Sequence, residues 1–159
     1  FVCKGRHITM QPQECGGIFG GDKACLPDIR SLVWARWQGR TQGGLPWAFS
    51  ISESPSHADC VHGDQVLWFD KQAYALPAIR ITRAGEDENA DWVIQDTEGM
   101  VDLTFSPRLM ENFQIRRPAI RTNYSSPRGV YNGTLVAPTG DKVNIRNAEG
   151  ILENLIIRG

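Results

Sequence analysis

In the stretch MVDLTFS, residues 100–106, apolar and polar side chains alternate from Val101 onward. On an extended backbone Val101, Leu103 and Phe105 project to one side, and the polar residues between them project to the other. A period of two is typical of a β-strand with one buried and one solvent-facing side. The stretch therefore predicts a strand whose apolar side covers a core.

The same alternation recurs in PWAFSIS (46–52), AIRITR (78–83) and DKVNIRN (141–147). Turn-forming residues such as Thr97-Glu98-Gly99 and Thr139-Gly140-Asp141 separate these runs. No segment of ordinary helix length shows the helical period. About nine or ten short strands joined by tight turns predict an antiparallel all-β fold, which closes into a barrel or splits into two packed sheets.

The composition limits the partners and the compartment that we expect. The 159 residues suffice for one domain, and 17 basic against 18 acidic residues argue against a nucleic-acid partner. No apolar run approaches the roughly 20 residues that span a membrane. The cysteines have irregular spacings, which is typical of reduced thiols in a cytoplasmic protein. Because the chain opens at Phe1 without a methionine, we expect a piece of a longer protein.

We predict no metal site and no cofactor. His57, Cys60 and His62 in HADCVH lack the second ligand pair that a closed zinc site needs. The glycine-rich stretch ECGGIFGGDK (14–23) lacks the G-K-[ST] ending of a phosphate-binding loop. Residues 83–91, RAGEDENAD, predict a charged and mobile loop.

Several motifs stand in a fixed order along the chain. From residue 100 onward they are a DLTF-P strand (102–107), a G-V-Y-x-G strand (129–133), a hairpin arm ending in I-x-N (140–147), and a final G-x-x-E with a later basic residue (150–158). Upstream stand WARWQGR (34–40), LPWAFSIS (45–52) and GDQVLWFDKQAYAL (63–76). With these motifs the chain resembles the domain of unknown function 2804 family, strongly after residue 90 and loosely before residue 60.

The resemblance implies a calycin-like, lipocalin-related β-barrel, which the strand pattern sizes at about 8–10 antiparallel strands. Members of that family are longer, so residues 1–159 are expected to form a single barrel domain that corresponds to their C-terminal half. A companion barrel, in the same protein or in a second chain, is the expected partner. Distant relatives of the family include hydratases and cyclases that act on apolar isoprenoid or polyketide substrates, which is an analogy of fold alone.

Tryptophans and one arginine supply the candidate ligand-binding residues. On a strand, Trp34 and Arg36 share one face, so Arg36 could stack on an aromatic ring or meet a carboxylate from a neighbouring strand. Trp34, Trp47 and Trp68 are predicted to line or rim a cavity, with Arg36 orienting an oxygenated ligand. Alternatively the indoles fill the core, as large aromatic side chains usually do.

Glu153 is the candidate catalytic residue. The stretch GILENLIIRG (150–159) is apolar on both sides of this acid, and a buried carboxyl group could transfer a proton. The alternative, which we favour, is a structural ion pair with an arginine such as Arg36, Arg146 or Arg158.

Three functions remain open from the sequence. The first is a lipocalin-like module that binds a hydrophobic small molecule. The second is a cofactor-independent lyase, isomerase or cyclase that uses Glu153, and whether the chain is an enzyme stays undecided. The third is a filled barrel that only packs against its partner.

Overall fold

The computed structural model describes residues 2–9, 11, 29–40, 44–53, 65–118 and 120–158, and in these residues it contains strands and no helix. The strands are β1 (Val2–Cys3), β2 (Arg6–His7), β3 (Ile29–Arg40), β4 (Pro46–Glu53), β5 (Val66–Phe69), β6 (Gln72–Ala75), β7 (Ile79–Arg83), β8 (Trp92–Asp96), β9 (Val101–Leu109), β10 (Asn112–Arg117), β11 (Ile120–Ser125), β12 (Arg128–Val136) and β13 (Lys142–Arg158). No helix in this part of the chain is long and apolar enough to cross a membrane.

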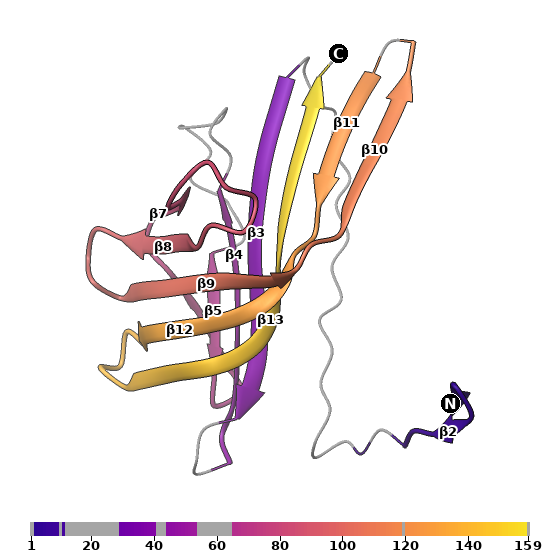
Figure 1. Ribbon diagram of the computed structural model, residues 1–159. Helices are drawn as coiled ribbons and strands as arrows, with labels where there is room; N and C mark the ends of the chain where they lie inside the picture. The colour runs from indigo at the N-terminus through magenta and orange to yellow at the C-terminus, as the bar shows by residue number, and fades with distance from the viewer. Residues whose placement is uncertain are drawn as a thin grey trace.

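One sheet contains all the strands except the small β1–β2 hairpin. Nine of its strands follow the path β6-β5-β4-β3-β13-β12-β9-β8-β7, and all neighbours on that path are antiparallel. The sheet curls into a half-barrel (Figure 1), and Glu53 of β4 joins it across the curl by accepting a hydrogen bond from the backbone N–H of Ile81 on β7. The predicted antiparallel all-β fold is therefore confirmed, and its shape is consistent with a calycin-like barrel.

The predicted alternation determines which side chains form the core. Val101, Leu103 and Phe105 of β9 are at most 1% exposed, and Phe105 packs on the ring of Tyr131 with ring centroids 4.7 Å apart. The apolar residues of the other alternating stretches are buried as well: Trp47, Phe49, Ile51, Ile79, Ile81, Val143 and Ile145. The hairpin glycines Gly99 and Gly140 have φ angles of 76° and 90°, which the predicted tight turns require.

The longest strand, β13, joins two parts of the sheet. Its first part, Lys142–Ile151, pairs with β12, whereas its last part pairs with β3 on one edge and with β11 on the other. Strands β11 and β12 lie end to end along one edge of β13. Their antiparallel partners, β10 and β9, lie end to end beside them, so β9–β12 form one long bent hairpin. Its outer portion, β10 and β11, is called the arm, and it extends beside the end of β13 (Figure 1).

Candidate functional site

The two faces of β3 have different surroundings. On the core face Ala35 is fully buried, and Trp37 packs against Trp47 with ring centroids 4.0 Å apart. On the opposite face the Arg36 guanidinium lies 5.7 Å from the centroid of the Trp34 ring, and its Nη1 lies 3.1 Å from Oε2 of Glu153. Both contacts that the sequence predicted for Arg36, an aromatic ring and a carboxylate, are present.

Glu153 uses both carboxylate oxygens. Oε2 accepts from Arg36, and Oε1 accepts a hydrogen bond from the hydroxyl of Tyr124 on β11. Burial and this hydrogen bond raise the pKa of Tyr124, because ionisation would place a phenolate beside a carboxylate. The ion pair that the sequence favoured is therefore formed, with Arg36 as the partner. The catalytic role of Glu153 stays a prediction.

The predicted ligand-binding residues do not meet at one cavity. Trp47 lies in the core at 5% exposure, whereas Trp68 is 40% exposed. Trp68 pairs with Ala48 and Trp34 pairs with Ser52, so these two indoles lie about 13 Å apart along β4, four residues at roughly 3.3 Å each. Their ligand-binding roles stay predictions.

A pocket of about 220 Å³ lies where the arm and the end of β13 face the loop after β7. We call it the polar pocket, and its walls are Arg83, Glu88, Met110, Asn112, Phe113, Gln114, Asn123, Tyr124, Ser125, Asn154 and Ile156. Arg83 and Glu88 belong to the stretch that the sequence predicted as a charged loop. The arm residues were not predicted as a site.

Three residues of this pocket wall each have a buried polar side-chain atom without a hydrogen-bond partner: Nε of Arg83, Oγ of Ser125 and Oδ1 of Asn154. Ser125 and Asn154 are direct cross-strand neighbours on β11 and β13. Arg83 ends β7, and its guanidinium lies 4.7 Å from the ring centroid of Trp92. Together these atoms offer one donor, one acceptor and one hydroxyl that can act as either.

Each buried polar atom without a partner costs about 1–3 kcal/mol of stability, so three of them in one pocket wall lower the stability of the fold. A molecule with both an acceptor and a donor could pair all three atoms. Apolar side chains in the pocket wall, Met110 and Ile156, would contact the rest of such a molecule. Tyr124 follows Asn123 and precedes Ser125 in the pocket wall, but its side chain projects to the opposite face of β11, where its hydroxyl bonds Glu153.

The family model of the domain of unknown function (DUF2804) matches residues 1–158. The chain belongs to the DUF2804 family. No curated protein and no solved structure gives a significant match to it. The resemblance inferred from the sequence is thereby confirmed as a family assignment over essentially the whole chain. The correspondence to a C-terminal half and the companion barrel are not tested by this match and stay predictions.

The DUF2804 chain shows no cluster of three or more potential metal ligands among His, Cys, Asp and Glu in its described parts. The HADCVH motif, with His57, Cys60 and His62, lies outside the described residues. The glycine-rich stretch 14–23 lies outside them too.

The sequence did contain a signal for the arm of this DUF2804 member. In NFQIRR, residues 112–117, Phe113 and Ile115 alternate with polar residues, and Pro118 marks the turn. The alternation could have predicted one more strand, followed by a turn. It could not have predicted that the polar side of this strand would face a pocket, because the opposite side is no better buried.

Proposed function

We propose that this DUF2804 chain is a lipocalin-like module that binds a hydrophobic small molecule, and that the polar pocket receives the uncharged polar group of that molecule. The observation that carries this proposal is that Arg83, Ser125 and Asn154, each with an unpaired buried polar atom, line one pocket. A hydroxyl or carbonyl oxygen on an otherwise apolar ligand would pair with the Arg83 donor and the Ser125 hydroxyl. A ligand N–H or O–H would pair with Asn154.

The size of the pocket supports a ligand that extends beyond it. Pockets that enclose whole drug-sized ligands measure about 300–1,000 Å³, whereas the polar pocket measures about 220 Å³. Met110 and Ile156 provide apolar surface in the wall that holds the polar atoms. The ligand would therefore place one polar end in the pocket and lay its apolar body along the arm.

Binding is tested by titrating the purified chain with retinol, a fatty alcohol and an aromatic polyketide while recording tryptophan fluorescence. Trp92 lies next to Arg83, so an occupied polar pocket should change its emission. We expect at least one of these probes to bind. A flat response with all of them contradicts the proposal.

Two substitutions locate the binding. Asn154→Leu and Ser125→Ala should each weaken the bound probe about tenfold, because a hydrogen bond to the ligand is lost. Neither should destabilise the free protein through loss of a hydrogen bond, because neither atom has a partner in it. Ser106→Ala on β9, outside the pocket, is the matched control and should leave the affinity unchanged. If all three variants bind the probe with the affinity of the natural chain, the ligand binds elsewhere.

One observation favours the second candidate, a cofactor-independent lyase, isomerase or cyclase. The Tyr124 hydroxyl donates to Glu153 beside Arg36, so a proton donor backed by a carboxylate stands on the face of β11 and β13 opposite Ser125 and Asn154. Glu153→Gln should then leave probe binding nearly intact and abolish turnover of any compound that the chain converts. Unchanged turnover in this variant would eliminate the role.

A further inference from the structure

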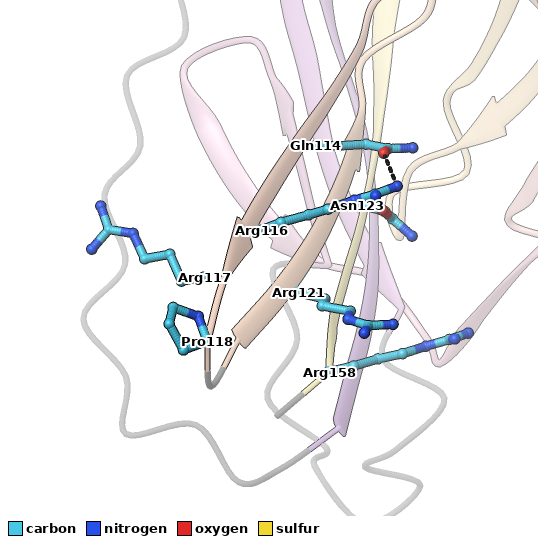
Figure 2. Close-up of a pocket in the computed structure, with 7 residues that line it drawn as sticks. All are labelled: Gln114, Arg116, Arg117, Pro118, Arg121, Asn123 and Arg158. Carbon is cyan, nitrogen blue, oxygen red and sulfur yellow. Dashed lines mark hydrogen bonds between the residues drawn. The ribbon is translucent and has the colours of Figure 1, made fainter.

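A second pocket, of about 520 Å³, lies at the outer end of the arm (Figure 2). Its walls are Gln114, Arg116, Arg117, Pro118, Arg121, Asn123 and Arg158. Gln114 and Asn123 also line the polar pocket, so the two pockets are adjacent along the arm.

Three of these arginines occupy one row across three strands. Arg116 of β10 pairs with Arg121 of β11, and Arg121 pairs with Arg158 of β13. Direct cross-strand neighbours project from the same face with Cβ atoms about 5 Å apart. Figure 2 shows these three side chains extending to the same side, whereas Arg117 extends to the other. We call Arg116, Arg121 and Arg158 the arginine ladder.

Within the described residues, no acid forms an ion pair with the arginine ladder. The ion pairs among the described residues are Arg36–Glu153, Arg80–Glu53 and Arg128–Glu111, and no aspartate or glutamate lines this pocket. The partner of Arg116 is the amide oxygen of Gln114, 3.1 Å from its Nη2. The chain as a whole has a net charge of −1, so three adjacent unpaired cations are a local concentration and not the result of a basic composition.

This arrangement costs stability, because like charges directly opposite on neighbouring strands repel. A bound anion would replace this repulsion between arginines with attraction between each arginine and the anion. Guanidinium groups donate pairs of parallel hydrogen bonds to phosphate oxygens, and three of them can surround a group that carries two negative charges. The amide groups of Gln114 and Asn123 add neutral hydrogen-bonding capacity at the border with the polar pocket.

We propose that the arginine ladder is a binding site for a phosphate ester. The ladder lies four residues along β11 and β13 from Ser125 and Asn154, which is roughly 13 Å at 3.3 Å per residue. One elongated molecule could therefore place a phosphate on the ladder and an apolar body with a polar group toward the polar pocket. This second step rests on the proposed function, whereas the anion site does not.

The anion site is tested with inorganic pyrophosphate, which needs no apolar contact. Isothermal titration of the chain should show binding that weakens as salt is raised, because exposed charges are screened. Arg121→Gln, at the centre of the ladder, should weaken it about tenfold. Arg146→Gln on β13, outside the pocket, removes the same charge and should leave binding unchanged. Absence of pyrophosphate binding, or equal losses in both variants, overturns the proposal.

Folding of the variant is checked independently. Because Arg121→Gln removes a repulsion between like charges, the melting temperature of the free variant should equal or exceed that of the natural chain. A lower melting temperature would mean that Arg121 has a structural role, and it would contradict the unpaired state on which the inference depends.

Matched ligands separate this inference from the proposed function. In the natural chain decyl phosphate should bind more tightly than decanol. In Arg121→Gln the two compounds should bind with the same affinity. Binding of decanol with no gain from the phosphate rejects the ladder and leaves the polar pocket standing. The opposite result is that decanol does not bind at all, whereas decyl phosphate binds both the natural chain and Asn154→Leu. This result rejects the polar pocket and supports the ladder.

The source of the phosphate is resolved by two further probes. Sedimentation with phosphatidylcholine vesicles, with and without phosphatidic acid, tests a lipid headgroup, and soluble decyl phosphate tests a free ester. Binding of either that is weakened in Arg121→Gln supports the site. Preference for a single-stranded oligonucleotide over both would overturn it in favour of a nucleic-acid surface.

Discussion

The two ends of the long hairpin β9–β12 follow the same alternation of apolar and polar residues, yet only one end buries it. On β9 the apolar side is covered, and Phe105 is fully buried. On β10 both sides are exposed, with Phe113 and Ile115 at 58% and 54%. Alternation of apolar and polar residues is therefore enough to form a strand but not enough to bury its apolar side. The arm has strands without a core of its own.

Strand β13 shows where the change occurs. Leu152, Asn154, Ile156 and Arg158 lie on one face by alternation. Leu152 is fully buried in the core, Asn154 has an unpaired oxygen in the polar pocket, and Arg158 belongs to the arginine ladder. One face of one strand thus passes from core to pocket within seven residues. Unpaired polar groups where a core could continue contribute less stability than buried apolar side chains would, which agrees with the binding site proposed for this segment.

The largest test of this comparison substitutes one phenylalanine at each end of the hairpin. Phe105→Ala should lower the free energy of unfolding by about 3–5 kcal/mol, because it leaves a cavity beside Tyr131. Phe113→Ala should lower it by less than about 1 kcal/mol, because the ring is already mostly in solvent. Urea unfolding followed by circular dichroism measures both. Equal losses would show that the arm has a core contact as important as that of β9.

A smaller effect is expected at the junction between the two regions, where Arg36 of β3 pairs with Glu153 of β13. The two side chains are 20% and 17% exposed, so the pair is only partly screened from water. Arg36→Ala should cost about 1–2 kcal/mol, less than for a fully buried pair, because it leaves the carboxylate without its cation.

A double-mutant cycle isolates the pairwise contribution at this junction. Arg36→Ala combined with Glu153→Gln should cost less than the sum of the two single changes. Additive losses would show that Arg36 stabilises the sheet through its contact with Trp34 and not through Glu153.

The sequence predicted the antiparallel all-β fold better than the site for a physical reason. The alternation in residues 100–106 reports burial directly, and it correctly placed Val101, Leu103 and Phe105 in the core. It also predicted an arginine partner for Glu153, because an acid in an apolar stretch needs a cation, and of the candidates Arg36, Arg146 and Arg158 the structure pairs Arg36 with it.

The arm was beyond this reasoning, since its pockets depend on register. Arg116, Arg121 and Arg158 are far apart in sequence and become neighbours only through the pairing of β10, β11 and β13. For Trp47 and Trp68 the fold has the opposite effect, because it separates residues that the sequence assigned to one cavity. Both read as candidate cavity residues, but the sheet separates them onto different faces.

The smallest expected effect concerns pH and sharpens the link between arm and barrel. Burial and the hydrogen bond to Glu153 raise the pKa of Tyr124 above its ordinary value of about 10. In the unfolded chain the phenol ionises near that ordinary value, so the folded state holds the proton to higher pH. The stabilisation is therefore fully present below about pH 10 and is lost as the pH rises through the folded-state pKa.

Tyr124→Phe should remove part of the alkaline decline in the free energy of unfolding between about pH 9 and 11. The remaining part is expected from the buried Tyr131, whose pKa burial also raises. Tyr74→Phe removes an exposed hydroxyl bonded to Gln72 and is the matched control, so it should keep the natural decline. If Tyr124→Phe declines as steeply as the natural chain, the hydroxyl does not bind Glu153 in solution, and the arm is not tied to the barrel through this bond.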